Sequence, residues 1–540
     1  MAAAEDARTR GVLARSYASA QLVWKLRRYI PTAAATAVTH LTSSTYPDAW
    51  PLSTSLFVAL ARFSSDSARA RRHARALGGE VGEVDVVAET QKNRARIERL
   101  IVGESGRLPK NGVVVPVSFR VRSRRGLPGI LAEPDSIETG ERRVGAEWSA
   151  HDSLWAMSTT PPAARVVLFF HGGAYCLLSP KTHRPLCLRL SRELGARVFS
   201  VDYRLAPETK FPGALHDAVS AYLYLTQELG IAPTEILVAG DSAGGNLATA
   251  LVLYLRDHSA RVVAPVPRGV VLLSPWVDLT ASFASWDSNR VTDYLALDDL
   301  TDPLVPTKLF ARTERDLVDR YASPAIASDV EFAGFPPVVV VAGQGETLRD
   351  EIAVLAQRLD RAGVDVTHEE YEGGVHVFVA VTVAGLGECA ITRIGEWSRH
   401  PTRFARARRE QTTTTLNESD DDDDDDGDWA RIESELDEAY RRKRDDMTRN
   451  DDLDGPGRKQ QTDPPRRREE DRDEPRFVFE ATSGVERVIE LRPRAHPAAR
   501  AALDELARLD DRGGGGSNTV VVRAKRNPKY QGGWWARLHI

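Results

Sequence analysis

Two short glycine-containing segments, each directly after an apolar run, constrain the fold of this sequence more than any other feature. Residues 171–174 (HGGA) follow the apolar run 165–170, and residues 240–244 (GDSAG) follow the apolar run 235–240. Apolar runs of this length predict short buried strands, and the apolar spacing after the second segment predicts a helix. The second segment is therefore predicted to form a sharp strand-to-helix turn with Ser242 at its centre.

A hydroxyl group at such a turn has the chemistry of a nucleophile. The turn presents Ser242 at the carboxyl end of a strand, because the glycines on either side let neighbouring backbone approach closely. The glycines after His171 lack a Cβ atom, so their N–H groups are able to point at a developing negative charge. We expect the N–H groups of Gly172, Gly173 and Ala243 to form an oxyanion hole. Either segment alone also fits an ordinary turn, whereas the two together favour a catalytic serine.

A serine nucleophile needs a base, and on this kind of sheet the acid and the histidine follow the serine in the chain. His258 ends the helix after the turn, and His368 lies inside a predicted strand. His400 and His496 lie at or beyond the end of the predicted folded region. His376 lies in a glycine-containing loop after the last predicted strand, so we predict that it is the base. The alternative interpretation is a structural histidine at the start of a helix.

The acid that orients this base is expected beyond another buried strand, residues 336–342 (PPVVVVA). Glu346 lies in the loop that follows, whereas Asp350 and Glu351 lie one turn into the next helix, where they favour its positive end. We therefore predict that Glu346 is the acid. The alternatives left open are Asp350, Asp278 and Asp302.

Together these motifs resemble the hormone-sensitive-lipase-like branch of the α/β-hydrolases, over about residues 110–395. The segments that carry the resemblance are 171–174 (HGGA), 201–208 (VDYRLAPE), 240–246 (GDSAGGN), 274–280 (SPWVDLT), 348–351 (LRDE) and 373–378 (GGVHVF). The resemblance implies that the catalytic serine, acid and histidine fall on Ser242, Glu346 and His376. It also implies that Gly172 and Gly173 supply the donors of the glycine loop.

Two residues depart from the pattern of this branch. The acid before LRDE is usually Asp, and Glu346 in its place resembles fungal steryl acetyl hydrolases. Ala174 stands where a third glycine is common. The resemblance implies a carboxylic-ester hydrolase that cleaves short, acetyl-like esters of apolar alcohols through an acyl-enzyme. The alternatives are an amidase or arylacetamide-type deacetylase, and a non-catalytic ligand receptor on the same fold.

The predicted fold class is the α/β-hydrolase fold, with a mostly parallel central sheet and helices on both faces. We predict an N-terminal helical cap or lid region over residues 1–105, as in related enzymes, and a catalytic domain over residues 106–400. Residues 401–540 hold 28 basic and 32 acidic side chains. Such a composition predicts a mostly disordered tail. Strand-like alternation in residues 476–491 and helical spacing in residues 497–509 mark two exceptions.

Charge and hydropathy indicate which binding partners and which cellular compartment to expect. The tail has no net positive charge and no stacking motif, so nucleic acid is not expected as a partner. No apolar stretch is long enough to predict a spanning helix, and Glu5 and Asp6 interrupt any signal peptide. Sparse cysteines at Cys176, Cys187 and Cys389 suit a reducing compartment. We expect a cytoplasmic protein or one peripherally associated with internal membranes, not secreted, with no metal and no cofactor.

Overall fold

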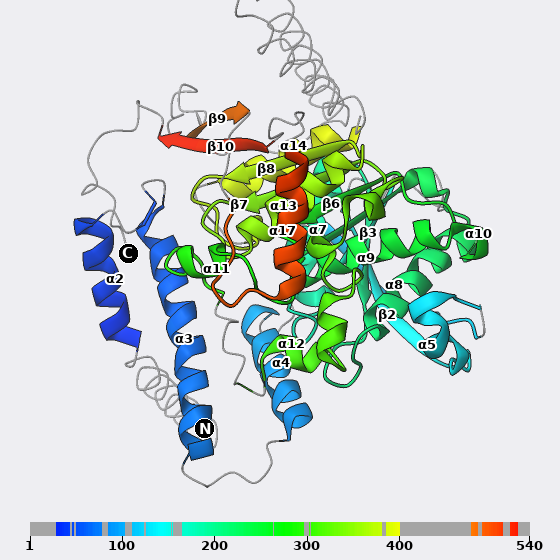
Figure 1. Cartoon of the computed structure of the whole chain (residues 1–540), viewed down its shortest axis with the longest axis horizontal. Helices are drawn as coiled ribbons and strands as arrows, with labels where there is room; N and C mark the ends of the chain where they lie inside the picture. The colour runs from blue at the N-terminus through cyan, green and yellow to red at the C-terminus, as the bar shows by residue number, and fades with distance from the viewer. Residues whose placement is uncertain are drawn as a thin grey trace, which may run out of the picture. The chain divides into compact units, whose positions relative to one another are not determined.

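The apolar runs of the sequence form central strands of one sheet in the computed structural model (Figure 1). The sheet has ten strands in the order β1-β2-β4-β3-β5-β6-β7-β8-β10-β9. The structure describes residues 29–43, 46–47, 50–77, 85–102, 111–123, 126–152, 154, 165–262, 264–295, 302, 304–380, 385–399, 477–483, 489–510 and 519–526. The strands are β1 (Gly112–Arg120), β2 (Arg143–His151), β3 (Val166–Phe170), β4 (Arg197–Asp202), β5 (Ile236–Asp241), β6 (Gly269–Leu273), β7 (Val338–Gly343), β8 (Val366–Tyr371), β9 (Phe477–Ser483) and β10 (Thr519–Arg526).

Strands β4, β3, β5, β6, β7, β8 and β10 are parallel to their neighbours in this order, and the remaining pairs are antiparallel. Parallel strands finish at the same edge of a sheet, and ligands bind at that edge. Asp241 at the end of β5 lies opposite Leu273, and Gly343 at the end of β7 lies opposite Tyr371. The loops that carry Ser242, Glu346 and His376 therefore leave the sheet at one edge.

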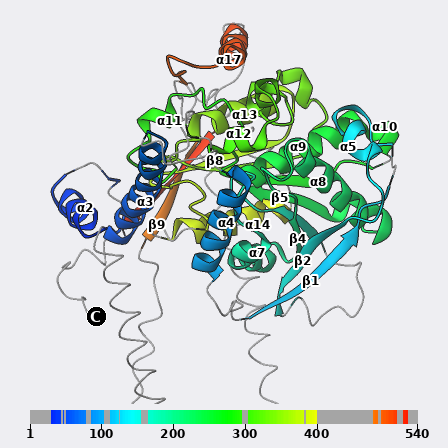
Figure 2. The ribbon, with the colours of Figure 1, turned by 90° about the horizontal axis from the view of Figure 1, so that it is seen from below.

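Helices cover both faces of the sheet (Figure 2). The helices are α2 (Ile30–Thr42), α3 (Leu52–Leu77), α4 (Val86–Val102), α5 (Ala132–Ser136), α7 (Pro180–Leu194), α8 (Gly213–Leu223), α9 (Ala243–Asp257), α10 (Ser259–Val262), α11 (Ser285–Ser288), α12 (Pro306–Phe310), α13 (Arg349–Arg361), α14 (Leu386–Arg399) and α17 (Pro497–Asp510). Single 3₁₀ turns are η2 (Gly129–Leu131), η4 (Pro233–Glu235), η5 (Glu314–Val318), η6 (Pro324–Ile326) and η7 (Asp329–Phe332), and η3 (Tyr224–Glu228) is a π-helical turn.

Burial on both faces explains why the central strands β3, β6 and β7 have continuous apolar sequences. Val167 and Phe169 of β3 pack into one core with α7 and α14, whereas Leu168 and Phe170 pack into a second core with α8, α9 and α13. The five residues of β3 are all buried. The predicted fold class, a mostly parallel sheet with helices on both faces, is confirmed.

The N-terminal helices attach to the body through a few specific contacts. Trp50 is 1% exposed and packs into the core beneath α7 and α14. Arg94 of α4 donates to the carbonyl oxygens of Cys176 and Ala206 and pairs with Glu208. Residues 1–28 of the predicted cap region lie outside the described residues. Within the described part, no helix combines the length and apolar character required to cross a bilayer.

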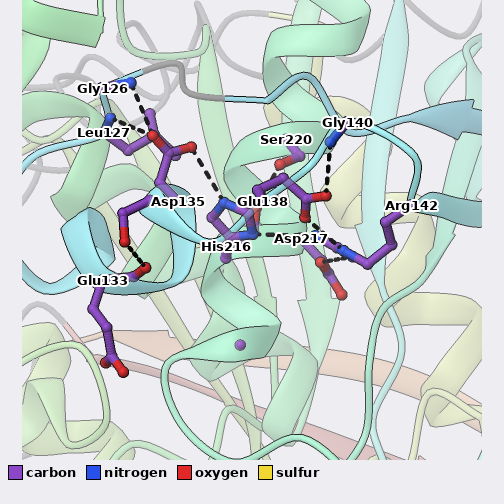
Figure 3. Close-up of polar contacts among 12 residues, drawn as sticks. Gly126, Leu127, Glu133, Asp135, Glu138, Gly140, Arg142, His216, Asp217 and Ser220 are labelled. Carbon is purple, nitrogen blue, oxygen red and sulfur yellow. Dashed lines mark hydrogen bonds and ion pairs between the residues drawn. The ribbon is translucent and has the colours of Figure 1, made fainter.

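A polar network ties the outer, antiparallel strands to α8 (Figure 3). Arg142, next to β2, donates to Asp217 Oδ1 over 2.6 Å and to Glu138 Oε2 over 2.7 Å. Its second amino group lies 3.1 Å from His216 Nδ1, and His216 Nε2 lies 3.5 Å from Asp135 Oδ1. Since Asp217 is fully buried, these partners compensate a carboxylate that burial alone would strongly disfavour.

Part of the C-terminal region completes the fold. The two predicted exceptions in the tail are present, as strand β9 and helix α17. Strand β10, which the sequence analysis did not predict, pairs in parallel with β8 and extends the sheet. Residues 401–476, for which disorder is predicted from composition, lie outside the described residues. Trp534 and Trp535, near the end of the tail, lie outside them as well.

Residues 489–510, here called the C-terminal clasp, dock on the body through backbone and side chains. Leu491 forms a bridge with Phe283, and the Arg492 N–H group donates to Ser282 O over 2.8 Å. Farther along, Arg358 of α13 donates to Ala502 O over 2.7 Å, and Leu506 is 2% exposed. The clasp therefore covers α13 and the segment that precedes α11.

Candidate active site

Ser242 occupies the turn between β5 and α9 in a backbone conformation that few residues adopt. Its φ angle is +52°, in the region that disfavours side chains with a Cβ atom. Gly240 and Gly244 are required on either side, because a Cβ atom at Gly240 would collide with Gly244 O, and one at Gly244 would collide with Phe170 O. The predicted strained turn is thus present, with the serine at its apex.

The three side chains predicted to act together lie in hydrogen-bond contact. His376 Nε2 lies 2.9 Å from Ser242 Oγ, and His376 Nδ1 lies 2.8 Å from Glu346 Oε2. Glu346 is fully buried, His376 is 3% exposed and Ser242 is 9% exposed. Burial thus decreases from the acid to the hydroxyl, which is the one of the three most open to a substrate.

The alternative acids lie elsewhere. Asp350 pairs with Arg349 and accepts a hydrogen bond from the Ser285 N–H group. Asp278 accepts hydrogen bonds from Thr280 and Ser282. Asp302 accepts one from the Leu304 N–H group. The structure thus brings Glu346 to His376 Nδ1, and it places the three alternatives among other partners.

The environment favours positive charge on the imidazole. Burial alone lowers the pKa of His376, but the hydrogen bond and charge of Glu346 outweigh it, and the pKa lies above its ordinary value. Burial raises the pKa of Glu346, while the bond with His376 and the Gly343 N–H group oppose that rise. Glu346 therefore fixes the ring with Nδ1 protonated, so that Nε2 faces Ser242 as an acceptor.

Four neighbours hold the loop of residues 373–378 in place. The Val377 N–H group donates to Ser274 Oγ over 3.0 Å, and the His376 N–H group donates to Asp293 Oδ1 over 3.1 Å. The Gly345 N–H group donates to Gly374 O over 2.9 Å, which joins this loop to the one that carries Glu346. At the start of the loop, Gly373 O accepts from the side chain of Trp50. The base is thus held at its backbone as well as at its ring.

The three residues of the glycine loop after β3 that follow His171 differ in the partners of their N–H groups. The Gly172 N–H group donates to Asp241 Oδ1 over 3.0 Å, so this donor is already engaged and does not face the serine site as an open donor. Gly173 and Ala174 have φ angles of +113° and +53°, and their N–H groups form no hydrogen bond with another described residue. The N–H group of Gly172 thus has another partner, whereas those of Gly173 and Ala174 have none among the described residues.

Two further residues, Asp241 and Tyr203, bind this loop. Asp241 is 3% exposed and also lies 3.3 Å from His183 Nε2, on α7. Tyr203, in the segment 201–208 (VDYRLAPE), stacks on the His171 ring at 4.4 Å and donates to His171 O over 2.6 Å. This segment carries part of the family resemblance, but no local pattern in the sequence predicts these contacts. Asp241 had one local signal, since it directly precedes Ser242.

Comparison with known proteins places the chain in a family. Residues 167–380 match the family described as the alpha/beta hydrolase fold. An acetyl-hydrolase of Streptomyces hygroscopicus is 37% identical over 269 residues, which cover 50% of this chain and 84% of that protein. The chain belongs to the hormone-sensitive-lipase-like α/β-hydrolases. Like other members of the family, this α/β-hydrolase is a serine hydrolase that acts on ester bonds.

Other relatives of this α/β-hydrolase carry similar names. The versiconal hemiacetal acetate esterase of Aspergillus parasiticus is 31% identical over 279 residues, which cover 50% of this chain and 85% of that protein. A solved esterase of the bacterial hormone-sensitive lipase family is 30% identical, covers 58% of this chain and 92% of its own, and superposes with a TM-score of 0.47.

Proposed function

We propose that this α/β-hydrolase cleaves short acyl esters of apolar alcohols with Ser242 as nucleophile, His376 as base and Glu346 as acid. The continuous path of hydrogen bonds from Ser242 through His376 to Glu346 carries the proposal. Ser242 Oγ attacks the ester carbonyl carbon while its proton passes to His376 Nε2. The alcohol leaves with that proton and an acyl-enzyme remains. Water then attacks the acyl-enzyme by the same path and releases the acid.

The oxyanion of each tetrahedral intermediate is assigned to the N–H groups of Gly173, Ala174 and Ala243. The first two are free of other described partners, and the third is the first amide of α9, which has no partner inside the helix. The N-terminus of α9 adds a favourable dipole for negative charge. Loss of one such donor typically lowers turnover about 100- to 1000-fold.

The substrate class is supported by the names of relatives and by the surroundings of the base. Two relatives are named for acetyl or acetate esters. The Tyr294 ring lies 6.0 Å from the His376 ring, and the Phe57 ring of α3 lies 5.5 Å from Tyr294. An apolar alcohol group is well matched to such aromatic neighbours. On this view α3 takes part in a lid over the site.

Kinetics on p-nitrophenyl esters test the function. We expect the purified protein to hydrolyse p-nitrophenyl acetate faster than the palmitate ester and faster than p-nitroacetanilide. Ser242→Ala should lower kcat by about 10⁴- to 10⁶-fold and abolish labelling by a fluorophosphonate probe. Undiminished hydrolysis by Ser242→Ala would refute the nucleophile, and faster cleavage of the anilide would favour an amidase.

We propose further that helix α2 contacts a membrane surface. Its sequence has no acidic, lysine or arginine residue, and Ile30, Val38 and Leu41 are 64%, 60% and 73% exposed. With Ala34, these residues recur at intervals of three and four and share one face. The neighbouring helix α3 carries five arginines and one aspartate in its sequence. An exposed apolar face on a helix whose neighbour has a basic sequence suits a bilayer that contains anionic lipid.

Flotation with liposomes tests this contact. We expect the full chain to float with vesicles of phosphatidylcholine and phosphatidylserine, and less with phosphatidylcholine alone. The double variant V38D/L41D should lose flotation. Val330→Asp is the matched control, because Val330 is 81% exposed and lies in η7, away from α2 in the sequence. Equal flotation of the double variant and the parent protein would refute the role of α2.

A further inference from the structure

A buried carboxylate outside the three proposed catalytic side chains connects the loops of the acid and the base. Asp293 is fully buried. Its Oδ1 atom accepts hydrogen bonds from the N–H groups of His376 over 3.1 Å and Tyr294 over 2.8 Å. Its Oδ2 atom accepts from the N–H group of Thr347 over 2.8 Å and from Thr347 Oγ1 over 3.0 Å. Thr347 is the residue directly after Glu346.

Two residues shortly before Asp293 also bind the loop that carries Glu346. Asn289 Nδ2 donates to Gln344 O over 3.0 Å and to Glu346 O over 2.8 Å. Thr292 Oγ1 donates to Gly345 O over 2.9 Å. Residues 289–293 therefore hold the backbone on both sides of the Glu346 side chain, and Asp293 adds the link to the base.

Asp293 differs from an uncharged side chain that only holds two loops together by hydrogen bonds. Four donors surround the carboxylate, yet in the described part of the chain no lysine or arginine pairs with it. A carboxylate only accepts hydrogen bonds, whereas an amide in its place would turn an N–H group toward one of these donors, so the carboxylate satisfies all four. The same arrangement brings the negative charge of this carboxylate close to His376, whose N–H group is one of the four donors.

We propose that Asp293 is a positioning residue for the reaction, which keeps the Glu346 and His376 loops at a fixed separation and stabilises the imidazolium that forms during proton transfer. This inference rests on the proposed function of Ser242, His376 and Glu346. Two carboxylates would then serve one imidazole, with Glu346 at the ring and Asp293 at the backbone.

The charged and titratable groups around His376 set the expected pH dependence. Ser242 lies at Nε2, Glu346 at Nδ1 and the Tyr294 ring at 6.0 Å, while Asp293 and Asp241 contribute charge without touching the ring. Both aspartates raise the pKa of His376. Because His376 acts as a base only when neutral, removal of the Asp293 charge should move the acid limb of activity to lower pH.

The test is the pH profile of kcat/KM for p-nitrophenyl acetate, followed at a wavelength where p-nitrophenol absorbs independently of pH. In Asp293→Asn, kcat should fall by about 10- to 100-fold, because the two loops are less well aligned. The acid limb should also move to lower pH, so that the variant keeps a larger fraction of its maximum near pH 6 than the parent does. A loss of activity that is uniform across pH would overturn the electrostatic role.

Further variants distinguish a failure of the role of Asp293 from a failure of the proposed function. Asp278→Asn removes another fully buried carboxylate, whose partners are Thr280 and Ser282, and it should leave the acid limb of the pH profile unmoved.

If Asp293→Asn does not fold, Thr347→Val becomes the test, since it removes one hydrogen bond to Asp293 and keeps the charge of Asp293. We expect kcat about 3- to 10-fold lower there, with KM unchanged. An unchanged kcat in Thr347→Val would overturn the inference. Persistent activity in Ser242→Ala would instead refute the proposed function.

Discussion

The indole N–H group of Trp50 donates a hydrogen bond to the carbonyl oxygen of Gly373, 323 residues later in the chain. Gly373 has a φ angle of +73° and begins the loop that carries His376. Trp50 precedes α3 and also stacks on Tyr46 with a centroid distance of 5.6 Å. A residue of the N-terminal region thus supports the loop that carries the base.

Replacement of Trp50 by phenylalanine should affect both stability and turnover. The variant leaves Gly373 O without its donor, which should lower the free energy of unfolding by about 1–3 kcal/mol. A less well held loop should also lower kcat by about 10-fold. Urea unfolding and ester kinetics measure the two effects. Trp397→Phe is the control, because Trp397 is buried and its Nε1 atom has no hydrogen-bond partner in the described part of the chain. Equal kcat values for both variants would contradict the link to catalysis.

Asp241 should matter for turnover more than for substrate binding. Its carboxylate fixes the Gly172 N–H group and thereby the direction of the two amides that follow. In Asp241→Ala we expect kcat to fall by about 100-fold, on the scale of one lost oxyanion donor, with a smaller change in KM. Asp217→Asn provides the comparison, because Asp217 is a fully buried carboxylate that pairs with Arg142 and Arg204. A fall in kcat of the same size there would show a general effect of buried charge loss.

The buried histidine at the start of the glycine loop should make the protein sensitive to mild acid. Burial, with the charge of His183, lowers the pKa of His171 to about 3. The unfolded chain protonates this ring near pH 6.5 and the folded chain does not. The free energy of unfolding should therefore fall by about 1.4 kcal/mol per pH unit below about 6.5 from this residue alone.

Substitution of the ring isolates that contribution. His171→Phe keeps an aromatic ring beside Tyr203 and cannot take up a proton. Between about pH 6.5 and 5.5, the parent protein should lose about 1 kcal/mol more stability than the variant in urea unfolding, because the unfolded ring is already half protonated at pH 6.5. The pKa of His183 is raised, because the charge and hydrogen bond of Asp241 outweigh burial. Protonation of His183 therefore stabilises the folded protein as the pH falls, but this histidine is present in both the parent and the variant, so it does not contribute to the difference between them. Parallel stability curves would contradict the assignment.

The C-terminal clasp should contribute measurable stability. Leu506 is 2% exposed and packs into the core that contains α8, α9 and α13. Leu506→Ala should lower the free energy of unfolding by about 2–4 kcal/mol. Leu503 of the same helix packs only partly buried against that core, so Leu503→Ala should cost less. If neither substitution changes the unfolding midpoint, the clasp does not stabilise the fold in solution.

The sequence predicted those parts of the molecule whose signals are local. The turn at Ser242 was predictable because the glycines, the preceding strand and the following helix all lie within about 20 residues. Strands β3, β5 and β7 were predictable because burial on both faces requires continuous apolar runs. The choice of Glu346 over Asp350 followed from its place in the loop before α13.

The parts that escaped prediction depend on contacts between distant segments. The engagement of Gly172 depends on a carboxylate 69 residues away, and no local pattern reports the direction of an amide. Asp293 lies in a segment without a motif, and its role follows only from the two loops that surround it. Strand β10 comes after a long charged region, so its pairing with β8 had no signal in chain order.

The position of β10 has a consequence for synthesis on the ribosome. Strand β8 ends at Tyr371 and its parallel neighbour begins at Thr519, so the 147 residues from 372 to 518 separate them. At about 5–20 residues per second, roughly 7 to 30 s pass between translation of the two strands. During that interval one side of β8 offers unpaired backbone groups to other nascent chains. Faster elongation or a chaperone that shields this strand should therefore raise the yield of native enzyme.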